Sequence, residues 1–269
     1  MKILYILLTA SVIFVAPTVF SQTLDTLVDV GTHKLHFRVM PGKGLPIVFE
    51  SGGGNDGSVW GNVMRLLREQ TDAPLIAYDR AGFGESEIDT MHVNIINEVK
   101  DLQTGLKKLV SGSAYFFVAH SLGGNYAMKF ISDRPSYVKG AVFIDVVSPY
   151  FMTEVRAANT KKLWASDLEE IKKESIGFYH LALNYECTSR VLRNVANSIE
   201  IPLTVIASGK TPFEGEDRKL FLKALKRFAM DRKNRKYILV EDADHYVFYD
   251  QPHLVVDEII NLYNTIKEP

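Results

Sequence analysis

The segment 115–124 constrains the fold of this chain more than any other part of the sequence. An apolar, aromatic-rich run that is typical of a buried strand ends abruptly at Ser121, and a segment compatible with a helix follows. Small residues stand two positions before and two positions after the serine, at Ala119 and Gly123. A sharp turn from strand to helix strains the serine backbone and leaves room only for small neighbours. The pattern therefore predicts a strand–turn–helix unit that exposes the serine hydroxyl beside a helix N-terminus.

Apolar runs that favour strands alternate along the chain with segments that favour helices. The predicted helices cover residues 59–68, 93–110, 125–132 and 254–266, and the predicted strands of the central sheet cover 46–50, 75–78, 115–119, 138–147, 203–207 and 237–240. Two earlier segments, 24–30 and 34–39, flank Gly31 and predict an antiparallel hairpin. Strands that alternate with helices predict an α/β fold with a mostly parallel sheet covered by helices on both faces.

One long segment interrupts this alternation. Residues 148–200 have no convincing strand pattern and combine aromatic and aliphatic side chains with many charges. Long connections between strands of a compact domain are uncommon unless they form structure of their own or serve function. We therefore expect a small helical cap at 148–200, inserted in one domain that spans residues 22–269. The alternative is an ordinary helical excursion on the surface.

The N-terminal segment has the features of a secretory signal peptide. Lys2 precedes an apolar run that Pro17 interrupts, and Val19 and Ser21 stand at the positions expected just before a cleavage site. These features predict a signal peptide over residues 1–21 and a secreted or periplasmic protein without a stable membrane anchor after cleavage. The alternative is an uncleaved anchor, for which the apolar run is barely long enough.

The charge balance and the cysteine content limit the possible partners. Basic and acidic residues nearly cancel, which gives a formal net charge of −1 at pH 7, and basic residues form no cluster. We therefore expect no nucleic-acid partner. The single cysteine, Cys187, excludes an intramolecular disulfide, and the scattered histidines do not suggest a structural metal site.

Four segments carry motifs that belong together. They are the region around Ser121, the glycine-rich loop 50–55, the segment 78–86 and the segment 242–245. In this combination the chain resembles the α/β-hydrolase superfamily over essentially the whole of residues 22–269, which implies the fold expected above. We interpret Asp79 and Arg80, inside the segment 78–86, as a buried pair that holds the loops at the strand ends.

The resemblance implies roles for several residues. Ser121 corresponds to the nucleophile, and His245, after the last predicted strand, corresponds to the general base that accepts the serine proton. The backbone N–H groups of Gly53 and Leu122 correspond to the oxyanion hole, which stabilises negative charge on the substrate oxygen. Three consecutive glycines at 52–54 are more than a tight turn needs, which supports this role for the loop.

The acid that would orient His245 is open between two regions. Asp145 stands at the end of the strand that follows Ser121, a position that some superfamily members use. Many members instead carry the acid after the strand that is here 203–207, but Pro212 replaces the usual aspartate. The candidates nearby in that loop are Glu214, Glu216 and Asp217.

Together these residues predict a serine hydrolase that cleaves a carboxylic ester or related acyl bond of a small-molecule substrate through an acyl-enzyme. No metal and no organic cofactor is implied. Amidase or peptidase, thioesterase, carbon–carbon hydrolase and cofactor-free perhydrolase activities use the same set of residues and are alternatives. Another alternative is a non-catalytic receptor that keeps the fold and binds a small molecule in its pocket. The oligomeric state is not predicted.

Overall fold

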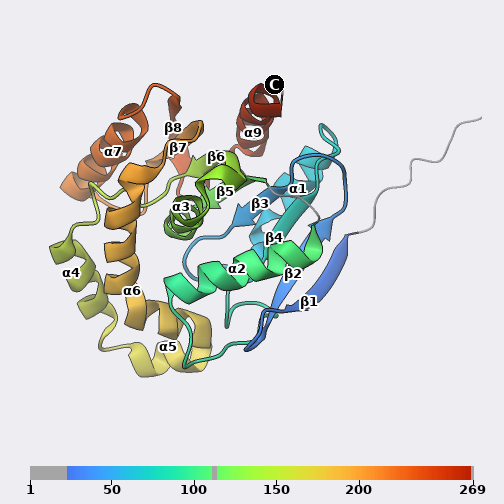
Figure 1. Ribbon diagram of the computed structural model, residues 1–269. Coiled ribbons are helices and arrows are strands. Elements are labelled where there is room, and N and C mark those ends of the chain that lie inside the picture. The colour runs from blue at the N-terminus through green and yellow to red at the C-terminus, as the bar shows by residue number, and fades with distance from the viewer. Residues whose placement is uncertain (1–22, 111–113, 268–269) are drawn as a thin grey trace, which may run out of the picture.

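A central β-sheet carries helices on both faces in the computed structural model, which describes residues 23–110 and 114–267 (Figure 1). The predicted signal peptide, residues 1–21, lies outside the described residues. Within the described ranges, no helix combines the length and the apolar character needed to cross a bilayer.

The sheet forms from the apolar segments that the sequence predicts as strands. In chain order the strands are β1 (Leu24–Asp29), β2 (Lys34–Met40), β3 (Ile47–Glu50), β4 (Leu75–Tyr78), β5 (Tyr115–His120), β6 (Val138–Ile144), β7 (Leu203–Lys210) and β8 (Arg235–Asp244). They lie side by side in the order β1-β2-β4-β3-β5-β6-β7-β8. β2 pairs antiparallel with β1 and with β4, and the remaining neighbours pair in parallel. β3, β4 and β5 are buried along their whole length, as strands covered on both faces must be.

Helices pack on the two faces of the sheet through separate apolar cores. The helices are α1 (Gly61–Arg68), α2 (Ile95–Leu109), α3 (Gly123–Asp133), α4 (Glu154–Trp164), α5 (Leu168–Glu174), α6 (Ile176–Val195), α7 (Gly215–Met230), α8 (Val247–Asp250) and α9 (Pro252–Lys267). Side chains alternate across a strand, so Phe116 of β5 joins one core with Val63 of α1, and Phe117 joins the other with Leu102 of α2. The α/β architecture expected from the sequence is confirmed.

Several strand boundaries differ from the expectation, and those of β6 and β8 have a clear physical reason. β6 ends at Ile144 rather than at 147, because Asp145 has a φ of +46°, which lies outside the extended region. β8 runs from Arg235 to Asp244, well beyond 237–240, because it continues along β7 past an irregularity in the pairing. A side chain at Gly209 of β7 would overlap the backbone of Glu241 of β8, so this close pairing requires a glycine.

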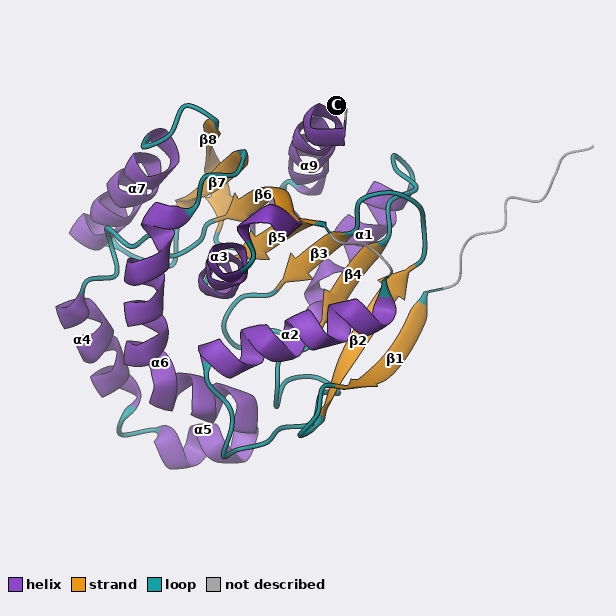
Figure 2. Cartoon of the chain, in the orientation of Figure 1, coloured by secondary structure: helices purple, strands orange, loops and turns teal. Residues whose placement is uncertain are grey.

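The segment 148–200 forms helices rather than strands. Its helices α4 and α5 both pack on α6, and α6 also contacts α3 (Figure 2). The N-terminus of α6 docks on the loop after β4, where the Gly177 N–H donates to the Gly82 carbonyl oxygen at 3.2 Å. A Cβ on Gly177 would lie 2.6 Å from that oxygen. The absence of a side chain therefore lets α6 approach the carboxyl end of β4 directly.

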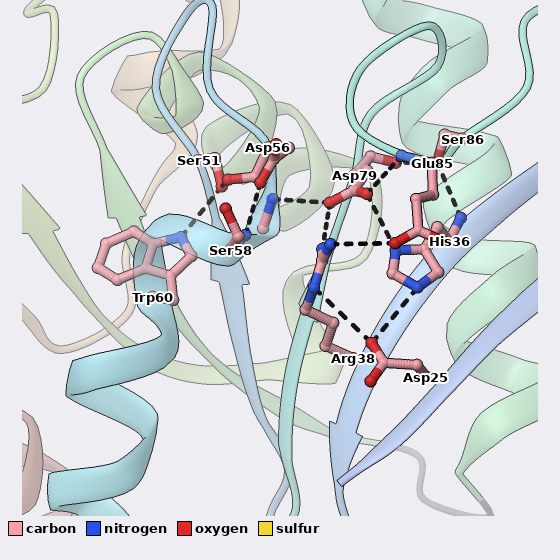
Figure 3. A network of polar contacts seen from close by, with 11 residues as sticks. Asp25, His36, Arg38, Ser51, Asp56, Ser58, Trp60, Asp79, Glu85 and Ser86 are labelled. Atoms are coloured by element: carbon pink, nitrogen blue, oxygen red, sulfur yellow. Dashed lines mark hydrogen bonds and ion pairs between the residues drawn. The ribbon is translucent and has the colours of Figure 1, made fainter.

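A buried carboxylate at the end of β4 ties several loops together (Figure 3). Asp79 accepts hydrogen bonds from the backbone N–H groups of Gly57 at 2.7 Å and Glu85 at 3.0 Å. His36 Nδ1 and the Arg38 guanidinium of β2 lie 3.0 Å and 2.6 Å from its oxygens. Burial alone would raise the pKa of Asp79, but these hydrogen bonds hold it below its ordinary value.

The neighbouring Arg80 pairs with a different acid than expected. Its guanidinium donates to Glu50 Oε1 at 2.8 Å, and both side chains are buried. The expectation that Asp79 and Arg80 form one pair is therefore wrong, because successive residues at a strand end point to opposite sides. The rings of Phe83 and Tyr126 lie 5.3 Å and 5.0 Å from the guanidinium carbon. Arg80 thus belongs to a second buried network.

A second acid joins this network from α2. Glu98 is 8% exposed and accepts a hydrogen bond from the Tyr126 hydroxyl at 3.1 Å. Burial raises the pKa of Glu98 to about 7, more than the Arg80 charge and the Tyr126 hydrogen bond lower it. Glu98 therefore keeps its proton at pH values at which an exposed glutamate has already lost it.

This shift predicts a pH-dependent stability. The folded protein holds the Glu98 proton up to a pH of about 7, whereas the unfolded chain releases it near the ordinary value of 4.5. The stabilisation is complete below pH 4.5 and is lost as the pH rises through 7. We expect the free energy of unfolding, measured with urea, to contain a Glu98 contribution that falls by about 3 kcal/mol over this range.

The substitution Glu98→Gln isolates this contribution, because glutamine keeps an acceptor for Tyr126 but does not titrate. The difference in unfolding free energy between wild type and Glu98→Gln should change between pH 4.5 and about 7. The matched variant Glu69→Gln, at an exposed position, should leave the pH dependence unchanged. Identical pH slopes in wild type and Glu98→Gln would contradict the raised pKa.

Candidate active site

Ser121 occupies a strained position directly after β5. Its φ is +52°, and its backbone N–H donates to the Ile144 carbonyl oxygen of β6 at 3.0 Å. Only small residues fit after it. A Cβ on Gly123 would overlap the Ser51 carbonyl oxygen, and a Cβ on Gly124 would lie 2.6 Å from Val146. The sharp turn expected from the sequence is therefore present, and it holds Ser121 at the carboxyl end of the sheet.

Asp145 lies at the same end of the next strand and is fully buried. Its carboxylate accepts hydrogen bonds from the Ser208 backbone N–H at 3.0 Å and from the Ser208 hydroxyl at 2.8 Å. Its Oδ2 also lies 2.7 Å from Nδ1 of His245. Three hydrogen bonds leave this carboxylate little freedom to rotate.

His245 follows β8 and is brought to Asp145 from a hundred residues further along the chain. The sequence did not indicate that His245 also contacts His120. The buried His120 ring lies 4.5 Å from the His245 ring, and its Nε2 is 3.0 Å from the His245 carbonyl oxygen. Burial and then the nearness of His245 lower the pKa of His120 well below its ordinary value. His120 is therefore neutral, and the contact to a carbonyl requires its proton on Nε2.

The alternative acids lie elsewhere. Glu214, Glu216 and Asp217 are exposed at the start of α7. Asp217 binds Arg156 of α4 through both carboxylate oxygens, at 2.6 Å and 3.0 Å. The structure thus brings Asp145 to His245 and leaves this group apart from it. Ser208, which fixes Asp145, had no signal in the sequence because it stands 63 residues away.

The glycine-rich loop approaches Ser121 from the end of β3. A Cβ on Gly53 would lie 3.2 Å from the Leu122 side chain, so the two candidate donors are neighbours. Leu122 is the residue before α3, where backbone N–H groups have no partner within the helix. The Ser51 hydroxyl donates to the Asp56 carbonyl oxygen at 2.8 Å and accepts from the Trp60 indole at 3.1 Å, which closes the loop (Figure 3).

These residues share one cavity of about 340 Å³. Its lining combines the candidate polar groups with an apolar, aromatic wall: Gly53, Ser121, Leu122, Asp145, Val147, Met152, Thr160, Trp164, Phe178, Leu181, Tyr185, Pro212, Phe213, Phe221 and His245. Residues of α4 and α6 supply much of that wall. Among the described residues no hydrogen bond joins the Ser121 hydroxyl to the His245 ring, and such contacts are often loose in ligand-free sites.

The sequence is similar to known proteins over much of its length. It is 29% identical over 143 residues to the probable transporter efuK of Hormonema carpetanum, and 28% identical over 152 residues to monoglyceride lipase of Homo sapiens. The matched regions cover 50% and 54% of this chain, but only 20% and 49% of the two relatives. The chain thus spans about a fifth and about half of their respective lengths.

The fold is also similar to that of solved structures. A thermophilic esterase from Thermogutta terrifontis superposes with a TM-score of 0.68 at 15% identity, over 91% of this chain and 99% of that chain. A model of the alpha/beta hydrolase family matches residues 47–258, which is most of this chain. The matched range begins at β3 and includes Ser121, Asp145 and His245. This chain therefore belongs to the alpha/beta hydrolase family.

Proposed function

We propose that this protein is a serine hydrolase that cleaves a carboxylic ester bond of a small, uncharged substrate. The observation that carries the proposal is the constellation at the cavity wall. A strained Ser121 opens into the same cavity as His245, whose Nδ1 lies 2.7 Å from the buried Asp145. A nucleophile, an orienting acid and a base, in this order along the chain, suit acyl transfer.

In the proposed reaction, each of the three side chains has a defined role in proton transfer. Ser121 Oγ attacks the ester carbonyl carbon while His245 Nε2 accepts the hydroxyl proton. Asp145 accepts the His245 Nδ1–H, so the free Nε2 is the nitrogen that can act as base. The carbonyl oxygen becomes negative as the carbon becomes tetrahedral. His245 then returns the proton to the alcohol oxygen as the carbon–oxygen bond breaks, which leaves an acyl group on Ser121.

The backbone N–H groups of Gly53 and Leu122 are the proposed donors to that negative oxygen. Both residues line the cavity beside Ser121, and donors fixed before the reaction stabilise the developing charge without reorganisation. Water then attacks the acyl carbon with His245 again as base. The ester bond to Ser121 breaks, the proton returns to Oγ, and the carboxylic acid leaves.

A substitution pair tests the nucleophile and the acid in the full-length protein. With p-nitrophenyl butyrate as substrate, Ser121→Ala should lower kcat by at least about 10⁴-fold. Asp145→Asn should lower it by about 10⁴-fold, because the amide favours the wrong tautomer of His245. Asp217→Asn is the matched control. It removes only an exposed ion pair, so kcat should stay within about twofold.

Other outcomes would redirect the assignment. Turnover that survives in Ser121→Ala would exclude Ser121 as the nucleophile. Full activity in Asp145→Asn together with loss of activity in Glu214→Gln, Glu216→Gln or Asp217→Asn would move the acid to the start of α7. Binding of the ester without turnover in wild type would favour the receptor alternative.

The cavity wall predicts discrimination by charge. Apart from Asp145 and His245, none of the described residues that line it is an aspartate, glutamate, lysine, arginine or histidine. An acyl chain that ends in a carboxylate would lose its water without gaining a partner. We expect kcat/KM for p-nitrophenyl butyrate to exceed that for the p-nitrophenyl monoester of succinic acid by at least about tenfold.

A charge added at the rim provides the control for this comparison. Pro212 is exposed and lines the cavity, so Pro212→Arg places a cation near the entering acyl chain. In this variant, the ratio of kcat/KM for the neutral ester to kcat/KM for the charged ester should be smaller than in wild type. Equal kcat/KM values for the two esters in wild type would contradict an apolar acyl site.

A further inference from the structure

The peptide bond between Gly52 and Gly53 has an unusual partner. The Arg80 guanidinium donates to the Gly52 carbonyl oxygen at 2.5 Å and to the Ser51 carbonyl oxygen at 2.6 Å. Both bonds are buried. The peptide whose oxygen Arg80 holds is the same peptide whose N–H, on Gly53, is the proposed oxyanion donor.

We propose that Arg80 is a positioning residue that fixes the orientation of the Gly53 N–H, an inference that rests on the proposed function. A trans peptide is planar, and its C=O and N–H point in opposite directions. Arg80 draws the Gly52 oxygen toward the buried side of the loop, so the Gly53 N–H must point away from Arg80. Gly53 lines the cavity beside Ser121 and Leu122, and in this proposal its N–H points into that cavity.

The loop needs such a restraint because its own sequence supplies little. Glycine rotates more freely than any other residue, and residues 52–54 are all glycine. Gly54 has a φ of +80°. Apart from Arg80, the described donor to the Gly52 oxygen is the Asn55 N–H, at the long distance of 3.3 Å. Without Arg80 this peptide could rotate and turn the Gly53 N–H away from the substrate oxygen.

Arg80 itself is held firmly enough to serve as a reference point. Glu50 binds it at 2.8 Å and in turn accepts from the Tyr78 hydroxyl at 2.5 Å. The Phe83 and Tyr126 rings flank the guanidinium. A guanidinium donates from several nitrogens in one rigid plane, so it can hold Glu50 and both carbonyls together. A lysine ammonium on a flexible stem cannot reproduce that geometry.

The substitution Arg80→Lys in the full-length protein tests this role, with p-nitrophenyl butyrate as substrate. A misoriented donor weakens binding of the transition state but not of the ground state. We therefore expect kcat to fall by about 10²-fold while KM stays within about twofold. Arg38→Lys is the matched control. Arg38 also binds a buried carboxylate, that of Asp79, but donates to neither loop carbonyl, so its kcat per folded molecule should not change.

A second readout separates positioning from a merely structural role. 1-Butaneboronic acid forms a tetrahedral adduct with an active serine, and one of its oxygens takes the place of the oxyanion. Its inhibition constant should weaken in Arg80→Lys by about the same factor as kcat falls, and should not change in Arg38→Lys. Loss of folded protein without a change in kcat per folded molecule or in boronate affinity would overturn the proposal.

A double variant keeps the test valid if Arg80→Lys does not fold. Glu50→Gln combined with Arg80→Met removes the buried Glu50–Arg80 ion pair as a unit, together with both Arg80 hydrogen bonds to the loop carbonyls. It should fold and show the same loss in kcat and in boronate affinity; retained kcat would overturn the role of Arg80. Wild type that neither turns over the ester nor binds the boronate would refute the proposed function itself, and the inference with it.

Discussion

The left-handed backbone at the ends of two neighbouring strands is the constraint on which the site depends. Ser121 and Asp145 both have positive φ values, +52° and +46°, and each such residue costs about 1–3 kcal/mol. The sheet holds both in place in the same way. The Ser121 N–H donates to Ile144 of the next strand, and the Asp145 N–H donates to Ile206 of the strand after that, at 2.7 Å. Because the parallel pairing continues past the turns, two side chains that an extended backbone would direct into the cores are instead presented at one edge.

Two adjacent residues after β4 organise the loops around that edge. Asp79 binds amides of the loops at 57 and 85, and Arg80 binds carbonyls of the loop at 51–52. The strand periodicity sends them to opposite sides, so the two networks do not compete. A buried charge is tolerated only where its hydrogen bonds are satisfied. The loops therefore gain fixed positions, because moving them would deprive these buried charges of part of their hydrogen bonds.

The sequence predicts the sheet and the serine turn well because both depend on local patterns. Apolar runs mark β3 to β7, and small residues around Ser121 mark the turn. Pairings between distant segments are not local. Asp145 contacts His245 from a hundred residues away and is held by Ser208, and the partner of Arg80 is Glu50 rather than the adjacent Asp79. Such contacts follow from strand order and register, which a residue pattern in one segment does not contain.

The place of the acid has a consequence for the loop after β7. With the acid of the proposed triad at Asp145, the segment 211–217 does not have to supply a carboxylate to His245. Pro212 and Phe213 line the cavity instead, and Asp217 binds Arg156 of α4, whose guanidinium lies 4.3 Å above the Phe151 ring. The exposed ion pair contributes little stability by itself, but it joins α4 to α7 across the cavity wall. A region that carries the acid in many related folds here shapes the cavity and anchors the helices beside it.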